Sequence, residues 1–263
     1  MSEREYDTSV NVLGSIPNIN IIIETIRFYS INNDIEETKT KFVEENAFGF
    51  NISSSRKRFF SLIKKLFLTE PDKPDNEFFI DSLANDKSDT QFKKAQVYLE
   101  VFRKNALFHD IIKNLIYDKH HENKRLITTK ELFEFLLSIS EGTKLAEFSE
   151  ATVKNIASKY IAFMKRLDYF EEDEGYKSLI AYPRPSKEFI TYIVYLLDAE
   201  GNTDSDIYNS DLFEALMLEE GDKINLLKKG SMAGYYNFNQ AGDGTASFSL
   251  NYDREEIIDE LFE

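Results

Sequence analysis

Cysteine is absent from this 263-residue chain, tryptophan is absent too, and only three histidines are present. A chain without cysteine can form no disulfide, no thiolate metal site and no cysteine nucleophile. Because disulfides are a feature of oxidising compartments, this composition fits a protein of the reducing cytoplasm.

Long apolar runs are also missing. Apolar runs such as residues 21–23 and 192–197 are far shorter than the roughly 20 apolar residues that a membrane helix needs. The first residues, MSEREYDTSVNV, carry charge where a signal peptide would have its apolar core. We therefore expect a cytoplasmic protein with no membrane partner.

The chain nevertheless has enough apolar material for a large core, because 42% of its residues are hydrophobic and 14% are aromatic. Its formal net charge is −15, which argues against a protein that coats nucleic acid by bulk electrostatics. Such an average can hide local patches, so the distribution of charge matters more than the sum.

Apolar residues recur at helical spacing along most of the chain. The spacing predicts helices near residues 20–30, 35–45, 53–68, 77–85, 88–104, 107–117, 128–140, 149–166, 187–199, 208–218, 222–227 and 253–263. Strand formers around short turns predict β hairpins at residues 168–182 and 235–252. The first dozen residues are expected to be frayed, and residues 118–127 are expected to form a polar connector.

These elements predict a mainly α protein: a helical bundle with helix-turn-helix and winged-helix elements and minor β hairpins. We expect residues 1–70 to form an N-terminal helix-turn-helix region and residues 71–125 a helical bundle segment. Residues 126–200, two helices followed by a hairpin, are expected to form a winged helix-turn-helix. Residues 201–263 would add C-terminal helices with a β hairpin.

Positive charge is concentrated on two of the predicted helices. Helix 53–68 has five basic residues and no acid, and helix 149–166 has four basic residues against Glu150. Removing their combined charge of +8 from −15 leaves −23 on the rest of the chain. Such helices can contact DNA phosphates, although solvated helix faces are often charged without any nucleic-acid role. The candidate DNA-binding residues are Arg56, Lys57, Arg58, Lys64, Lys65, Ser149, Thr152, Lys154, Asn155 and Lys159.

The turn of the first predicted hairpin weighs against DNA binding. Four consecutive carboxylates, residues 171–174, would repel phosphate unless this wing meets a protein or points away from the DNA.

Catalytic and metal-binding patterns do not rise above chance in this sequence. Adjacent side chains such as His120 and His121 diverge on a helix, so a solvated connector explains them better than a metal site. Residues 198–211 lack the residue order of an EF-hand calcium loop. The glycine-containing turn AGDGT stands between strands rather than before a helix, so a phosphate-binding loop is not expected there. Tyr235, Tyr236 and Phe238 could stack on bases, but strand aromatics more often pack a core. We therefore expect no enzyme activity, metal or cofactor.

Four stretches of the chain resemble the BrxA family of BREX bacteriophage-exclusion systems: SSSRKRFFSLIKKLF, QFKKAQVYLEVFRKNALFHDII, ITTKELFEFLL and FSEATVKNIASKYIAFMKRLDYF. The resemblance covers about residues 21–200. It implies a compact, mostly helical, DNA-binding protein without enzymatic activity of its own. Such a protein would serve beside a methyltransferase, a phosphatase-like protein and an ATPase.

The function expected from the residues and the resemblance is therefore that of a non-enzymatic, DNA-binding accessory protein of a BREX phage-defence system. Its partners would be double-stranded DNA and other BREX proteins. The alternative is a protein–protein adaptor that docks through its acidic surfaces within the same defence complex, without binding DNA directly.

Overall fold

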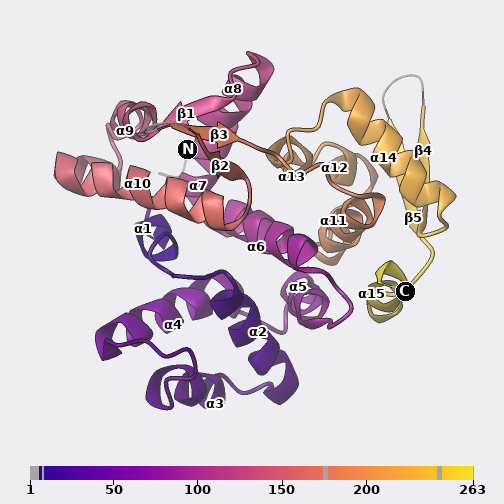
Figure 1. The fold of residues 1–263 in the computed structure, drawn as a ribbon. Helices are drawn as coiled ribbons and strands as arrows, with labels where there is room; N and C mark the ends of the chain where they lie inside the picture. Colours follow the sequence, from indigo (N-terminus) through magenta and orange to yellow (C-terminus); the bar gives the residue numbers. More distant parts are fainter. Residues whose placement is uncertain (1–5, 8, 174–176, 242–244, 263) are drawn as a thin grey trace.

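The computed structural model describes residues 6–7, 9–173, 177–241 and 245–262, and it is mainly helical, as the periodicity predicts (Figure 1). The α-helices are α1 (Ser9–Leu13), α2 (Asn20–Asn32), α3 (Ile35–Lys39), α4 (Ser53–Phe67), α5 (Pro74–Ala84), α6 (Thr90–Lys104), α7 (Ala106–Ile111), α8 (Tyr117–His121), α9 (Thr129–Ser138), α10 (Glu150–Arg166), α11 (Lys187–Ala199), α12 (Asp204–Tyr208), α13 (Asp211–Ala215), α14 (Glu220–Met232) and α15 (Arg254–Leu261). The strands are β1 (Leu126–Thr128), β2 (Phe170–Glu172), β3 (Lys177–Ile180), β4 (Tyr236–Gln240) and β5 (Ala246–Leu250). Among the described residues, no helix combines the length and apolarity that crossing a bilayer would require.

Two of the predicted helices are extended or interrupted by π-helical turns. Helix α3 continues into such a turn at Thr40–Glu44, and a second one at Ile112–Ile116 joins α7 to α8. The helical path therefore reaches His121, beyond the predicted end near residue 117.

The N-terminal residues differ from the prediction. Residues 9–13, which were expected to be frayed, form the short helix α1, in which Val10 and Leu13 are completely buried. Helix α1 packs against both α10 and α4 (Figure 1). Its five residues span little more than one turn, so no periodic pattern could develop in the sequence.

A three-stranded antiparallel sheet has the order β1-β3-β2. Strand β1 was missed in the predicted connector; it pairs with β3 through Leu126 opposite Leu179. Helices α9 and α10 lie between β1 and β2 in the chain and pack against each other. Thr128 ends β1 and caps α9, and two reciprocal hydrogen bonds between Thr128 and Glu131 form a capping box.

The C-terminal region has more breaks than the sequence suggests. One helix was predicted for residues 208–218, but the structure has two short helices, α12 and α13, because Ser210 caps a new helix there. Strands β4 and β5 form the predicted second hairpin. Tyr236 and Phe238 are buried in it, which supports the core interpretation of these rings. Residues 242–244 of the AGDGT turn lie outside the described residues.

A single cluster of buried apolar side chains runs through the molecule. It includes Ile63 of α4, Phe102 of α6, Tyr160 of α10 and Ile257 of α15. One of these residues comes from each of the four predicted segments, 1–70, 71–125, 126–200 and 201–263. The division of the chain into these segments stays a prediction. The core fixes the positions of the two basic helices relative to each other through α1, which contacts both.

Candidate nucleic-acid interface

Helix α4 is amphipathic, as its spacing of apolar residues predicts. One face carries Phe59, Ile63 and Phe67 into the core, where all three side chains are buried. The helix has no acidic residue, so every charge on its outer face is positive.

The cations of α4 have different environments. Lys57, Arg58 and Lys64 are exposed, and none of them forms an ion pair within the part of the chain that the structure describes. Lys65 is exposed too, but its ammonium lies 2.6 Å from the Asp7 carboxylate. Burial acts to raise the pKa of Asp7, yet the hydrogen bonds from Lys65 and Ser9 outweigh it and lower that pKa.

Arg56 is half-buried and serves the fold of this region. Its guanidinium donates a hydrogen bond of 2.7 Å to the carbonyl oxygen of Val43, which lies in the π-helical turn after α3. The side chain therefore joins the start of α4 to the preceding helix, and it is the least available of the five predicted phosphate contacts on α4.

The Ser149 side chain caps the start of α10. The Ser149 hydroxyl accepts a hydrogen bond of 3.3 Å from the backbone N–H of Thr152, and the two hydroxyl oxygens are 3.0 Å apart. Both side chains, predicted to face DNA, thus also stabilise the first turn of the helix. The opposite face of α10 buries Val153, Ile156 and Tyr160.

One edge of α10 is covered by α1 and the turn that follows it. The Asn155 amide donates a 2.8 Å hydrogen bond to the Asn11 side chain, and Arg166 donates one of 2.9 Å to the Gly14 carbonyl oxygen. Half-buried Lys159 contributes its backbone to the contact with Gly14. Asn155, a candidate for reading DNA, is therefore already hydrogen-bonded within the protein.

The outward stripe of α10 consists of small and basic residues. Ala151, Lys154 and Ser158 are exposed on it, and Lys154 forms no ion pair with any described residue. Lys165 continues the stripe, and its ammonium lies 3.4 Å from the Glu172 carboxylate of β2. Lys154 is thus the cation of α10 that is most available to a ligand.

Helices α10 and α4 lie on either side of α1 in the structure (Figure 1). The four exposed cations without an ion pair in the described chain, Lys57, Arg58, Lys64 and Lys154, are called the basic set below. Residues 171–173 at the tip of the sheet are exposed carboxylates, and the fourth predicted carboxylate there, residue 174, lies outside the described residues.

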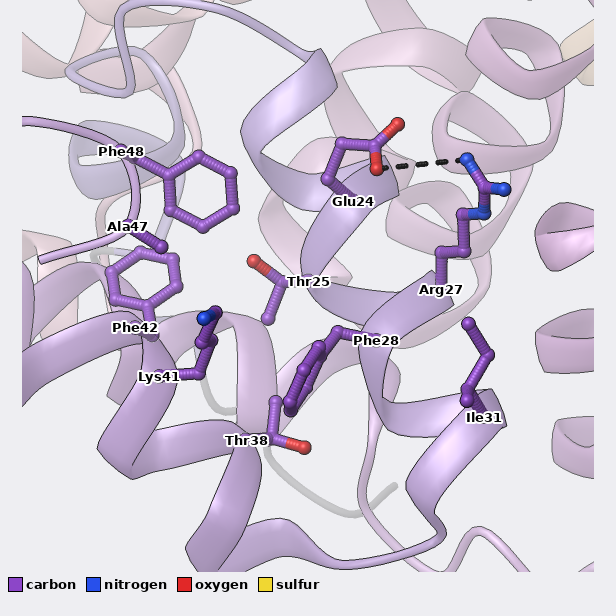
Figure 2. Close-up of a pocket in the computed structure, with 10 residues that line it drawn as sticks. All are labelled: Glu24, Thr25, Arg27, Phe28, Ile31, Thr38, Lys41, Phe42, Ala47 and Phe48. Carbon is purple, nitrogen blue, oxygen red and sulfur yellow. Dashed lines mark ion pairs between the residues drawn. The ribbon is translucent and has the colours of Figure 1, made fainter. Parts of the chain in front are cut away.

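An apolar pocket of about 330 Å³ opens next to this region, between α2 and the segment that follows α3. Figure 2 shows the rings of Phe28, Phe42 and Phe48 around it, with Ile31 at its edge. The Thr25 hydroxyl donates to a backbone carbonyl of its own helix, and Lys41 lies 2.9 Å from Glu45. These polar groups already have partners, so the pocket presents mainly an apolar surface.

Comparison with models of protein families gives a match. The model of the BrxA family matches residues 22–194, which is more than half of the chain. A search of curated proteins found no match. The matched part contains α4, α9, α10 and the three-stranded sheet, and it stops within α11. The chain therefore belongs to the BrxA family.

Proposed function

We propose that this protein is a non-enzymatic accessory factor of a BREX phage-defence system and binds double-stranded DNA through α4 and α10. Membership of the BrxA family associates the chain with BREX systems. No set of side chains with the spacing of a catalytic site was found in its sequence, which supports a binding role over a chemical one.

We further propose that residues 126–200 form a winged helix-turn-helix, whose strands and paired helices lie within residues 126–180. The chain order β1–α9–α10–β2–β3 and the sheet order β1-β3-β2 support this proposal. In helix-turn-helix proteins the second helix of the pair enters the major groove, and its N-terminal residues approach the bases. Helix α10 would have that role here, with Lys154 directed toward the DNA.

The observation that carries the proposal is the position of the basic set. These four cations are exposed in a chain of net charge −15, and in its described part they are not neutralised by ion pairs. Two helices that flank α1 present them, so one duplex could contact both. Neutralising phosphates releases condensed counterions, which makes binding depend steeply on salt.

The test is a salt titration of binding to a fluorescent DNA duplex, followed by anisotropy. We expect the wild-type affinity to fall steeply between about 50 and 200 mM salt. Replacing the basic set by alanine (Lys57→Ala, Arg58→Ala, Lys64→Ala, Lys154→Ala) should weaken binding. It should also make the slope of log affinity against log salt concentration shallower, by about one for each phosphate-binding cation removed.

The control is a variant with the same change in net charge at exposed lysines elsewhere: Lys39→Ala, Lys73→Ala, Lys87→Ala, Lys228→Ala. It should keep most of the wild-type slope if the basic set is the binding surface. Equal losses in both variants, or a wild type that does not bind DNA, would overturn the proposal.

The adaptor role is the second candidate, and the acidic tip of the sheet favours it. Glu171, Glu172 and Asp173 are exposed there, next to the end of α10. A basic protein of the same defence complex could dock on this tip. Co-purification with BREX proteins that survives nuclease treatment, but is lost in Glu171→Lys/Asp173→Lys, would support the adaptor role.

A further inference from the structure

A second concave surface lies away from α4, between the three-stranded sheet and the C-terminal region. It is a cleft of about 550 Å³, within the range of 300–1,000 Å³ typical of small-ligand sites. Three segments form it: residues 120–125 at the end of α8 and beyond it, residues 180–185 at the end of β3 and beyond it, and residues 216–229 between α13 and α14 and within α14. The last of these lies beyond residues 22–194, the part that matches the BrxA family.

Cations outnumber carboxylates along this cleft. Lys124, Arg125, Arg184 and Lys229 line it, against Glu219 and Asp222; Glu122 pairs with Lys124 from beside the cleft, so the excess is one positive charge. The surrounding chain is strongly acidic, with a net charge of −15. A local positive excess inside a concave surface attracts anions more strongly than the same charges on a convex one.

Three of these cations are available to a ligand. Arg125, Arg184 and Lys229 are exposed, and none forms an ion pair with a described residue. Lys124 is different, because its ammonium lies 2.8 Å from Glu122. A guanidinium group can donate two parallel hydrogen bonds to two oxygens of one phosphate, and an ammonium adds a compact positive charge. This set of cations therefore suits a phosphate group.

The position of Arg125 is fixed by the sheet. Its backbone carbonyl accepts a 2.7 Å hydrogen bond from the N–H of Ile180, which continues the pairing of β1 with β3. Arg184 follows Ile180 by four residues and stands between Pro183 and Pro185, whose rings restrict the backbone on both sides. The backbone of Arg125 is therefore fixed against Ile180, and Arg184 follows on a stiffened segment that lines the same cleft.

Besides the cations, the cleft has polar lining residues, His120, Asn123 and Asn225, and several apolar or aromatic ones. Tyr182 and Pro183 line one side, and Leu218 and Leu226 line the side formed by the C-terminal region. A flat, weakly polar group could rest against these walls while its phosphate meets the cations. The combined chemistry is that of a nucleoside phosphate.

We propose that the cleft between β3 and α14 binds a nucleoside phosphate, with Arg125, Arg184 and Lys229 holding the phosphate group. The nucleoside phosphate could be a free mononucleotide or the phosphorylated end of a nucleic-acid strand, because both present the same group. The site is separate from α4 and α10, so it does not depend on the DNA-binding role proposed above.

The experiment uses the full-length protein and isothermal titration with AMP, adenosine, inorganic phosphate and a short 5′-phosphorylated single strand. We expect AMP to bind more tightly than phosphate and adenosine to bind weakly, since the phosphate supplies the charge and the nucleoside the contact area. Tighter binding of the strand than of AMP, if the alanine variant of the basic set retains it, would identify a nucleic-acid end as the ligand. The reverse order would identify a free nucleotide.

Variants locate the site. The double variant Arg125→Ala/Arg184→Ala and the single variant Lys229→Ala should each weaken AMP binding at least tenfold. Lys228→Ala, the exposed neighbour on α14 that does not line the cleft, should bind like the wild type. The alanine variant of the basic set should also bind AMP normally, which separates this site from the proposed DNA surface.

Two results would overturn the proposal. One is a wild-type protein that binds neither AMP nor the phosphorylated strand at millimolar concentration. The other is AMP affinity that is unchanged in both cleft variants. Because Arg125, Arg184 and Lys229 are exposed, their loss should leave the thermal melting temperature within a few degrees of the wild type, and this can be checked in the same samples.

Discussion

Gly14, in the turn after α1, packs directly against the backbone of Lys159 in α10. A β-carbon at residue 14 would overlap the backbone carbonyl group of Lys159. The Gly14 carbonyl also accepts a 2.9 Å hydrogen bond from Arg166, one turn before the sheet. The absence of a side chain at this position therefore lets α1 approach the proposed recognition helix.

Gly14→Ala should destabilise the protein by about 3 kcal/mol, because the clash is with backbone atoms that cannot rotate away. Urea denaturation measures the loss. The control is Gly221→Ala in α14, where an added β-carbon meets no atom within 4 Å; this variant should be as stable as the wild type or slightly more so. Equal stability of Gly14→Ala and the wild type would mean that α1 and α10 are not packed as described.

The sequence allows the long helices to be predicted well, since each contains several turns of regular spacing. Helix α10 begins where Ser149 caps it, and α9 begins at its capping box. These are local features, and the atoms that form them lie within four residues of each other. Helix α1 and strand β1 were missed because their five and three residues depend on distant partners, α10 and β3.

The candidate interface could be predicted only in part, for a similar reason. The charges of α4 and α10 can be read from the sequence. The hydrogen bond between Asn155 and Asn11, 144 residues earlier, cannot, because it depends on the fold. The cleft beside β3 could not be recognised either, because Arg125, Arg184 and Lys229 are separated by long stretches of chain. Only the folded arrangement brings these cations to one surface.

Arg56 should separate stability from DNA binding. Arg56→Ala removes the hydrogen bond to the Val43 carbonyl oxygen, so we expect a loss of about 1–2 kcal/mol in the free energy of unfolding. Lys57→Ala, at the exposed neighbour, should leave stability unchanged but weaken DNA binding. Thermal melts and anisotropy titrations of the two single variants test this difference. If both variants melted like the wild type, Arg56 would have no structural role.

His109 should make stability depend on pH. The hydrogen bond that His109 donates to the Asp211 carboxylate raises the pKa of His109; burial opposes this, and the hydrogen bond to Asp110 adds to it. Its two ring nitrogens lie 3.1 Å from Asp110 and 2.9 Å from Asp211, and the ring stacks on Phe102. Because the pKa of His109 is higher in the folded state than in the unfolded state, protonated His109 stabilises the fold. This contribution is complete below the unfolded-state pKa of about 6.5 and is lost as the pH rises through the folded-state pKa.

We therefore expect the free energy of unfolding to decrease from pH 6 toward pH 9, by about 1 kcal/mol from this group. His109→Gln should remove that decrease, while His121→Gln, at an exposed histidine of α8, should retain it. Urea denaturation of the three proteins at several pH values provides the comparison. A wild-type stability that rises over this range, with no change in His109→Gln, would contradict the assignment.

Arg103 should be the most sensitive charged residue in the core. Its guanidinium, with a side chain only 9% exposed, pairs with Glu100 and Glu200 and lies 2.7 Å from Asp75. Glu100 is itself 1% exposed, and apart from Arg103 it pairs with Lys104 at 2.5 Å. This cluster joins α6 to α5 and to the end of α11.

Arg103→Met should lower the free energy of unfolding by about 3–5 kcal/mol, because the buried Glu100 carboxylate then keeps only one of its two cationic partners, Lys104. Arg103→Lys should recover only part of the loss, since an ammonium cannot bridge three carboxylates as a planar guanidinium does. The double variant Arg103→Met/Glu100→Gln should be more stable than Arg103→Met alone, as the uncompensated charge is then gone. Urea denaturation ranks the three. If the double variant were the least stable, the cost would come from poorer packing around the arginine stem rather than from a buried charge.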